Sequence, residues 1–570
     1  MDMREKISQA LYRALTAAFE QTDFESSALA RSLELPPEPE MGDMAFPCFS
    51  LSKTLRMAPP QIAQKIAVHV ADPLISSVEV KGGYLNFFLD RVYFAQKMIE
   101  AVQGSDGAWG QSDEGSGKTI CIDYSSINIA KRFHIGHLST TAIGHSLKRI
   151  YDYLGYRTVG INHLGDWGTQ FGKMIAAYKH WGSPEMVEQG GVQALSELYV
   201  RFHKEAEESP SLEDEGRAWF KRIEEGDKEA LAIFNNFKEI TLKDADRVYD
   251  ILDVSFDSYA GESFYNDKMD RVIRELREKN LLVLSQGAWV VDLEEFGMPP
   301  CLILKSDGAT LYATRDIAAA LYRKDTYHFS KCLYVVAYQQ DLHFRQVFKV
   351  LELMGYEWAK TQMEHVAFGM ISYEGEALST RRGNIVHLDE LLDKAQEKAL
   401  AIIEEKSPHL EDKEKIAKQV GVGSVIFFDL FNSRIKDIDF RWDRALNFDG
   451  ETGPYVQYTY ARCCSVLRKA GEVDTAPDFS ALDDKESLAL LKLISLFPET
   501  IRDAAARNEP SFVTRAITEM AKAYNKFYYE HRILSEDAAA SAARLALTDI
   551  VRAAIANGLY LIGMQAPPQM

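Results

Sequence analysis

The pattern of hydrophobic and polar residues first separates an N-terminal region. The opening segment, MDMREKISQALYRALTAAF, repeats apolar side chains at helical spacing. The run SSVEVKGGYLNFFL at 76–89 alternates apolar and polar positions around a glycine pair, which predicts a strand or a hairpin. A stretch rich in Gly, Ser and Asp at 104–118 predicts a linker or an exposed loop. We therefore expect an N-terminal α+β domain over residues 1–110.

From about residue 111, segments with strand and helix patterns alternate. Helical spacing over 137–154 and near 170–180 predicts helices between short apolar runs. These runs predict strands at 119–125, 158–162, 288–293, 301–305, 332–337 and 365–371. Strands that alternate with helices favour a parallel sheet in a doubly wound α/β domain. We expect that domain to span 111–450.

Two other regions have helical patterns alone. Residues from about 181 to 270 interrupt the alternation with polar sequence such as KEAEESPSLEDEG, which predicts a helical insertion. Over 451–570, apolar residues with many Ala and Leu recur at helical spacing, and no strand pattern is found. This predicts an all-α helix bundle at the C-terminal end.

Composition indicates the class of protein and its compartment. Apolar residues make up 46% and charged residues 26%, which is typical of a folded chain and excludes disordered and fibrous classes. The six cysteines show no C-x-x-C pair, so we predict reduced thiols and neither a disulfide framework nor a bound zinc ion. The N-terminus lacks the apolar core of a signal peptide, and no run approaches about 18 uncharged apolar residues. We expect a soluble, cytoplasmic protein with no membrane partner.

The net charge of −19 argues against indiscriminate binding of polyanions. The charge is unevenly distributed, however. Residues 181–250 hold 9 basic and 17 acidic side chains, whereas 451–570 hold 13 basic and 15 acidic ones. The C-terminal bundle is therefore nearly neutral and could bind nucleic acid through local basic and aromatic patches.

The segment DYSSINIAKRFHIGHL, residues 123–138, is the most informative for chemistry. It connects the first predicted strand of the α/β domain to the following helix, a position at which such sheets bind ligands and helix N-termini accept anions. His134 and His137 flank Gly136, which has no Cβ to hold a phosphate away. On its own, the H-x-G-H pattern is weak, and an isolated match would favour a helix-capping or metal-binding histidine pair.

Longer blocks extend this pattern into a family resemblance. The two histidines match the HIGH motif of class I aminoacyl-tRNA synthetases, and DYSSINIAKRFHIGHL resembles the corresponding stretch of arginyl-tRNA synthetases. Similar blocks are NHLGDWGTQFG at 162–172 and NFDGETGPYVQYTYAR at 447–462, and the resemblance covers essentially the whole chain. It implies a Rossmann-like catalytic domain, an N-terminal domain that contacts the tRNA body, and a C-terminal anticodon-binding bundle.

The resemblance also implies roles for residues of the HIGH segment. His134, His137 and Gly136 would form the site for the ATP phosphates, where donated hydrogen bonds stabilise charge at the α-phosphate. Lys131 would add a fixed positive charge. The sequence departs from the family at Ile127, where proline is usual and would restrict the backbone.

A pocket for arginine needs carboxylates and other acceptors, because a guanidinium only donates hydrogen bonds. Tyr312 and Asp316 have the i, i+4 spacing that places them on one face of a helix, and Gln340 follows a predicted strand. Without the resemblance, Asp316 and Gln340 would be read as an exposed helix charge and a polar loop residue. By resemblance, the pocket comprises Tyr312, Asp316 and Gln340, with Asp123, Asn128 and Ser125 as further candidates.

The second class I signature, a KMSKS loop, is degenerate in this chain. The matching stretch, ALSTRRGN at 377–384, has neither lysine, and a basic surface turn is the alternative interpretation. The resemblance nevertheless assigns an ATP loop to Ser379, Thr380, Arg381, Arg382 and Gly383. Our hypothesis is that Lys131 together with Arg381 or Arg382 supplies the missing charge.

Aromatic and basic residues are interleaved in two segments of the C-terminal bundle, 453–469 and 523–534. Such residues can stack on unpaired RNA bases, although any single tyrosine could simply pack between helices. The candidate tRNA contacts are Tyr455, Tyr458, Tyr460, Arg462, Tyr528 and Arg532.

The resemblance implies an arginine–tRNA ligase that forms arginyl-adenylate from L-arginine and Mg-ATP. The arginyl group then passes to the 2′-hydroxyl of the terminal adenosine of tRNA(Arg), and activation would require bound tRNA. We expect a monomer. Two alternatives remain: a class I synthetase for another amino acid, and a non-catalytic tRNA-binding paralogue, which the missing lysines motivate.

Overall fold

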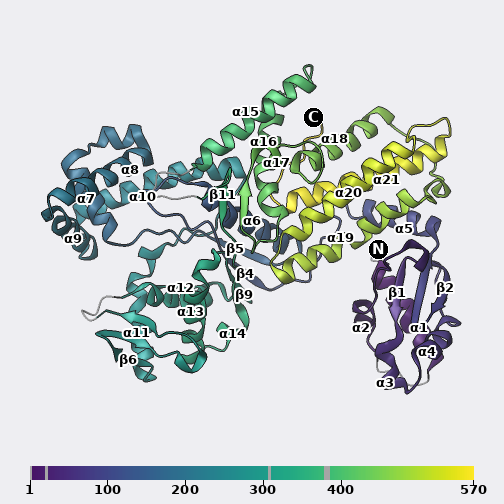
Figure 1. The fold of residues 1–570 in the computed structure, drawn as a ribbon, viewed down its shortest axis with the longest axis horizontal. Helices are drawn as coiled ribbons and strands as arrows, with labels where there is room; N and C mark the ends of the chain where they lie inside the picture. Colours follow the sequence, from purple (N-terminus) through teal and green to yellow (C-terminus); the bar gives the residue numbers. More distant parts are fainter. Residues whose placement is uncertain (1–2, 20–23, 306–309, 378–385) are drawn as a thin grey trace.

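The N-terminal region forms a small α+β unit in the computed structural model, which describes residues 3–19, 24–305, 310–377 and 386–570. Its antiparallel sheet has the order β1-β3-β2, formed by Met44–Pro47, Tyr84–Leu89 and Ile75–Lys81. Strands β2 and β3 pair as a hairpin, which confirms that prediction. Helices α1 (Met3–Ala18) and α4 (Pro59–Ala67) pack beside the sheet (Figure 1).

The central sheet is fully parallel, with the order β10-β9-β4-β5. Its strands are β4 (Thr119–Asp123), β5 (Arg157–Ile161), β9 (Lys331–Tyr334) and β10 (Met363–His365). Helices α6 (Leu138–Tyr153), α12 (Tyr312–Tyr327) and α13 (Asp341–Leu353) follow strands of this domain. The doubly wound prediction is confirmed, and the carboxyl ends of the strands define the binding edge.

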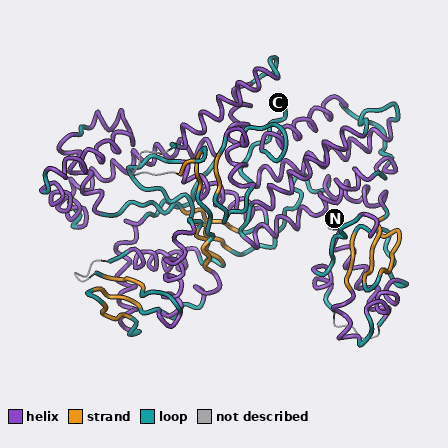
Figure 2. The backbone as a smooth tube through the Cα atoms, in the orientation of Figure 1, coloured by secondary structure: helices purple, strands orange, loops and turns teal. Residues whose placement is uncertain are grey.

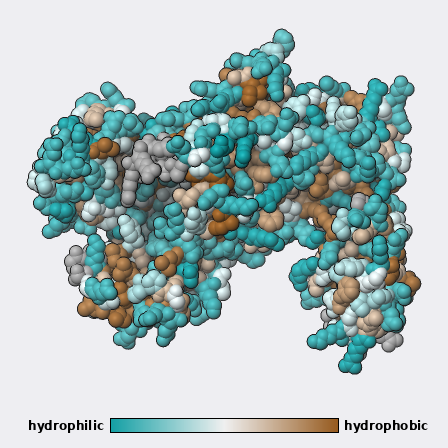
Figure 3. Space-filling model, in the orientation of Figure 1, coloured by the Kyte–Doolittle hydropathy of each residue, from teal (hydrophilic) through white to brown (hydrophobic). Residues whose placement is uncertain are grey.

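Three of the strand predictions need correction. The segments at 288–293 and 301–305 form β7 (Ala288–Val291) and β8 (Cys301–Leu304), which join β6 (Leu282–Ser285) in a separate antiparallel sheet. The connection between β7 and β8 is shorter than the dozen or so residues that a parallel crossover requires. Exposed apolar side chains on this sheet, Val283, Leu284 and Leu302, belong to a region where Figure 3 shows hydrophobic surface.

The predicted strand at 365–371 is the third correction, because two strands share it. It contains the end of β10 and the start of β11 (Ile371–Tyr373), which pairs with β12 (Glu376–Ala377) and β13 (Ile438–Phe440) in another sheet. The chain therefore leaves the parallel sheet immediately before the second signature.

The insertion and the C-terminal region are helical, as predicted (Figure 2). The insertion contains α8 (Pro184–Glu208), α9 (Ser211–Glu224) and α10 (Lys228–Leu252), which follow α7 (Thr169–Trp181). The C-terminal bundle contains α18 (Gly453–Ala470), α19 (Lys485–Arg507), α20 (Ser511–Glu530) and α21 (Ala538–Leu561). Over the described part of the chain, no helix is long and apolar enough to cross a membrane.

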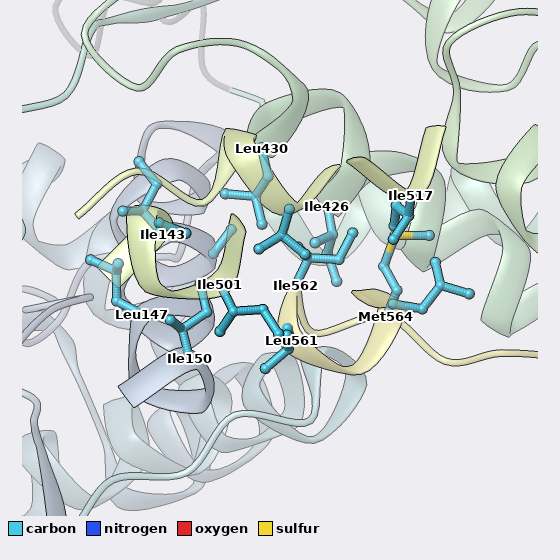
Figure 4. Close-up of a cluster of buried hydrophobic side chains, with 14 of the residues drawn as sticks. Ile143, Leu147, Ile150, Ile426, Leu430, Ile501, Ile517, Leu561, Ile562 and Met564 are labelled. Carbon is cyan, nitrogen blue, oxygen red and sulfur yellow. The ribbon is translucent and has the colours of Figure 1, made fainter. Parts of the chain in front are cut away.

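Helix α6 shares a hydrophobic core with α16 (Lys413–Phe431) and with the C-terminal bundle (Figure 4). Ile143, Leu147 and Ile150 of α6 face Leu430 of α16 and Ile501 of α19. A buried hydrogen bond reinforces this contact, since Tyr151 Oη donates to the carbonyl of Ala505 at 2.8 Å.

The six cysteines are free thiols, as expected.

Candidate active site

His134 immediately precedes the helical turn η3 (Ile135–His137) and His137 ends it, directly before α6. The Gly136 N–H donates to His134 Nδ1 at 3.1 Å, and the His134 N–H donates to His137 Nδ1 at 3.2 Å. Because each Nδ1 accepts a backbone proton, each neutral ring carries its own proton on Nε2. A Cβ on residue 136 would lie 2.8 Å from His134 Cε1, which explains the glycine between the histidines.

Burial keeps both imidazoles neutral. It lowers the pKa of His134 to about 4 and that of His137 to about 3, and the nearby charge of Lys131 acts in the same direction. Lys131 itself is exposed. The pair therefore presents two neutral N–H donors at a helix N-terminus, with a lysine nearby, an arrangement that suits phosphate oxygens.

The HIGH segment is bonded to the chain that follows the second signature. The Ile135 N–H donates to the carbonyl of Val386, and the Leu388 N–H donates to the carbonyl of Phe133. The chain that follows that signature, from Val386 to Leu388, is therefore held beside the histidines. The signature residues Ser379, Thr380, Arg381, Arg382 and Gly383 lie outside the described residues.

The loop between β4 and the histidines has an unusual backbone. Ser125, Ser126 and Ala130 have φ values of 69°, 48° and 62°, in the left-handed region that non-glycine residues rarely adopt. Ile127, which replaces the family's proline, is buried, and its carbonyl accepts from the Gly165 N–H at 2.9 Å. Asn128 is exposed and forms a parallel bridge with Gly165. These contacts fix the loop without a proline.

Asp123 is the buried end of β4, and both of its oxygens have partners. Oδ2 lies 2.7 Å from Arg323 Nη2, and Oδ1 accepts from Ser126 Oγ at 2.8 Å. The side chain of Arg323 is buried, so Arg323 and Asp123 already form a buried ion pair without a bound ligand. Asp123 is therefore placed to organise the site, rather than as an open acceptor.

Asp316 lies on α12 and is held by two imidazoles. His343 Nε2 lies 2.6 Å from Oδ2, and His163 Nε2 lies 3.9 Å from Oδ1. Burial acts to raise the pKa of Asp316, but the hydrogen bond from His343 and nearby positive charges hold it below its usual range. Tyr312, one turn earlier, is 67% exposed, and Gln340 is exposed before α13. Tyr312 and Asp316 therefore lie one turn apart on α12, and Gln340 immediately precedes α13, the helix that carries His343.

Sequence reasoning missed several residues around Asp316. Glu262 is mostly buried, 3.8 Å from Arg315, and burial raises its pKa to about 7. His163 and His343 contact Asp316 directly. A polar residue directly after a strand was an available signal for His163, whereas only three-dimensional packing identifies Glu262 and His343. Glu262 thus adds a second carboxylate within electrostatic range of Asp316, whose charge also acts to raise the pKa of Glu262.

A groove of about 630 Å³ crosses the C-terminal bundle and contains four of the six candidate tRNA residues, Tyr458, Arg462, Tyr528 and Arg532. The Arg462 guanidinium lies over the Tyr458 ring, 4.8 Å from its centroid, and over the Tyr528 ring, 4.9 Å from its centroid. Tyr455 and Tyr460 instead pack against the hydrophobic core. The last three residues of the chain also line the groove.

Comparison with known proteins agrees with this geometry. The family model described as "tRNA synthetases class I (R), catalytic domain" matches residues 98–442. The arginyl tRNA synthetase N-terminal domain matches 1–89, and the DALR anticodon binding domain matches 456–570. The chain belongs to the arginyl-tRNA synthetase family.

Relatives within the arginyl-tRNA synthetase family match along the full chain. An arginine–tRNA ligase of Alkaliphilus metalliredigens is 52% identical and covers 100% of both chains. One of Clostridium perfringens is 51% identical over 97% of this chain and 98% of its own. The solved arginyl-tRNA synthetase of Thermus thermophilus is 25% identical, with a TM-score of 0.82 and full coverage of both chains.

Proposed function

We propose that this protein is an arginine–tRNA ligase, which activates L-arginine with ATP and transfers it to tRNA(Arg). The observation that carries the proposal is the pairing of two neutral Nε2–H donors at His134 and His137 with a nearby carboxylate pocket. Full-length relatives at about half identity carry the same activity in their names, such as the 52% identical protein of Alkaliphilus metalliredigens.

In the first step, the arginine carboxylate attacks the α-phosphate of Mg-ATP, and pyrophosphate leaves. His134 and His137 donate to phosphate oxygens and stabilise the charge that develops there, with no change in their own protonation. Lys131 and the signature residues Arg381 or Arg382 would follow the leaving pyrophosphate. Under this proposal, a Lys131→Ala enzyme activates arginine poorly; near-normal activation would contradict it.

The guanidinium of the substrate would bind between Asp316 and Glu262. Two carboxylates match the planar donors of arginine, and a bound cation would favour the ionised form of Glu262, whose pKa burial raises to about 7. Tyr312 and Gln340 would close the exposed side of the pocket. Citrulline lacks the positive charge that the two carboxylates would bind, so we expect strong discrimination against it.

The α-amino and carboxylate end of the substrate would face the HIGH loop. Asn128 would supply a polar group there, whereas Ser125, whose buried Oγ is bonded to Tyr249 and Thr141, would act with Asp123, Arg323 and Ser126 to hold that loop in place. In the second step, the 2′-hydroxyl of the terminal adenosine of tRNA attacks the arginyl carbonyl and AMP leaves.

Unpaired anticodon bases would stack in the groove beside Tyr458 and Tyr528, where Arg462 adds charge. Residues 1–110 would contact the tRNA body, 111–450 would form the catalytic domain, and 451–570 would bind the anticodon. We further propose a cytoplasmic monomer.

The test is arginine-dependent exchange of pyrophosphate into ATP, with and without tRNA(Arg), using a panel of amino acids. Exchange with arginine and cognate tRNA alone supports the proposal. Exchange with a different amino acid would indicate another class I specificity, and no exchange under any condition would indicate a tRNA-binding paralogue.

A further inference from the structure

We propose that Tyr249 and Thr241, on helix α10 of the insertion, are positioning residues for the HIGH loop and therefore for the adenylation step. The inference rests on the proposed function for the reaction that it affects. Helix α10 otherwise belongs to an acidic, largely solvent-facing helical insertion. Its inner face nevertheless contacts the loop at both ends of the left-handed backbone segment.

Tyr249 holds the first of these positions. Its side chain is buried, and its hydroxyl lies 2.8 Å from Ser125 Oγ and 2.8 Å from Asn162 Nδ2. Because an amide nitrogen only donates, the Tyr249 hydroxyl accepts from Asn162 and keeps its own proton for Ser125. The hydroxyl therefore ties the end of β5 to the first left-handed residue of the loop.

The same network continues to the second histidine. Thr141 Oγ1 on α6 donates its proton to the carbonyl of His137 at 2.7 Å, and it lies 3.0 Å from Ser125 Oγ, from which it can accept. The Ser125 N–H donates to Thr140 Oγ1 at 3.0 Å. Buried polar networks of this kind fix one geometry, because every lost partner leaves a desolvated group. Tyr249 is thus connected to the backbone of His137 by three successive hydrogen bonds, through Ser125 and Thr141.

Ring packing adds a second connection between Tyr249 and the HIGH loop. The Phe133 ring meets Tyr249 edge-on at 5.5 Å between centroids and contacts the His137 ring at 5.0 Å. Phe133 immediately precedes His134 in the chain. The ring of Tyr249 therefore contacts His137 through the Phe133 ring, whereas its hydroxyl is hydrogen-bonded to Ser125.

Thr241 holds the other end of the loop. Its Oγ1 accepts from the Ala130 N–H at 2.9 Å and donates to the carbonyl of Phe237 at 2.8 Å. Ala130 has a φ of 62° and immediately precedes Lys131. Thr241 and Tyr249 are eight residues apart, about two helical turns, so one face of α10 carries both contacts.

These contacts support a role in catalysis beyond stability. The Nε2 donors act on the α-phosphate only if they lie within hydrogen-bonding distance of the charge that develops in the transition state. A loop that relaxes at Ser125 or Ala130 displaces the histidines without touching the arginine pocket at Asp316. The expected effect is a lower kcat with little change in the KM for arginine.

The main test compares Tyr249→Phe with the wild type in arginine- and tRNA-dependent pyrophosphate exchange. Loss of a buried hydrogen bond in this network predicts a fall of about tenfold in kcat, with the KM for arginine within about twofold. Tyr259→Phe is the matched control, because that ring also packs on Phe256 but its hydroxyl forms no hydrogen bond recorded among the described residues. It should retain its kcat.

A second pair of variants tests the other end. Thr241→Ser keeps the hydroxyl and should retain most of the activity, whereas Thr241→Val keeps the shape, removes the acceptor of the Ala130 N–H, and should lose kcat. Equal activities in the two variants would contradict a role for that hydrogen bond.

Hydrogen exchange and double variants separate positioning from general destabilisation. Amides of 124–137 should exchange faster in Tyr249→Phe than in Tyr259→Phe, at equal thermal midpoints. Combining Tyr249→Phe with Thr141→Val should lower kcat no more than the larger single substitution does, because both act through Ser125.

An unchanged kcat together with unchanged hydrogen exchange in Tyr249→Phe, with an active wild type, would overturn this inference. An inactive wild type would instead overturn the proposed function.

Discussion

At the residue scale, selectivity for a guanidinium depends on where Asp316 is held. The carboxylate is oriented by His343 at 2.6 Å and faces His163 at 3.9 Å, side chains that come from different elements. The hydrogen bond from His343 and the nearby positive charges hold the pKa of Asp316 below its usual range and so favour the ionised carboxylate, although burial acts to raise it. A carboxylate fixed in this way loses little freedom when the substrate binds.

Removing the side chain of His343 should weaken arginine binding. The His343→Ala variant loses a hydrogen bond to a charged group, worth about 1.5 kcal/mol, so the KM for arginine should rise about tenfold. His343→Gln can place an amide donor near the former Nε2 position and should lie closer to the wild type. The measurement is exchange at varied arginine; equal KM values for the wild type and His343→Ala would argue against this role.

His145 on α6 should make stability depend on pH. Burial, with the charges of Arg149 and Lys148, lowers its pKa to about 3, and its ring nitrogens have no hydrogen-bond partner among the described residues. Below its usual value of about 6.5, the unfolded chain binds a proton that the folded chain does not. Stability therefore falls as the pH decreases from 6.5, by about 1.4 kcal/mol per pH unit for this group.

The His145→Leu variant tests this effect. Urea unfolding followed by fluorescence between pH 4.5 and 7.5 should show a shallower acid-side decline than in the wild type. His409→Leu, at an exposed position, serves as the control and should follow the wild-type curve. Parallel curves for His145→Leu and the wild type would mean that His145 is protonated in the folded state.

At the scale of elements, periodicity predicted the parallel strands, the insertion and the bundle, but not the sheet to which each strand belongs. The segments at 288–293 and 301–305 have apolar runs like those of β4 and β9, and only their short connection marks them as antiparallel. Motif resemblance identified His134, His137 and Asp316. Glu262, His343 and Tyr249 reach the site through tertiary packing, which leaves no local signal.

The groove between α18 and α20 provides a prediction at this scale. Arg462→Ala removes the cation that lies over the rings of Tyr458 and Tyr528. Because loss of such a contact commonly costs about 1 kcal/mol or more of binding free energy, the KM for tRNA in charging assays should rise about tenfold. Arg507→Ala, which loses a similar stack on Phe512 outside the groove, is the matched control. Equal effects of the two substitutions would mean that Arg462 stabilises the bundle without contacting tRNA.

At the scale of the whole molecule, the bundle and the catalytic domain share one core. Besides the contacts of Figure 4, Ser146 Oγ on α6 donates to the carbonyl of Leu561 on α21 at 2.9 Å. A tRNA that occupies the groove therefore binds a surface continuous with α6, the helix that begins at the HIGH histidines. This continuity offers a physical route by which bound tRNA could influence activation.

The whole-molecule charge supplies the last prediction. Despite the total of −19, four cationic side chains line the groove: Arg462, Arg468, Lys469 and Arg532. If these neutralise about four phosphates of a single-stranded loop, log K should fall with log salt at a slope of about −3. Filter binding of tRNA(Arg) between 50 and 300 mM salt measures the slope, and Arg468→Gln should make it shallower by about one contact. A flat response would mean that the acidic total, and not the local groove, governs the approach of tRNA.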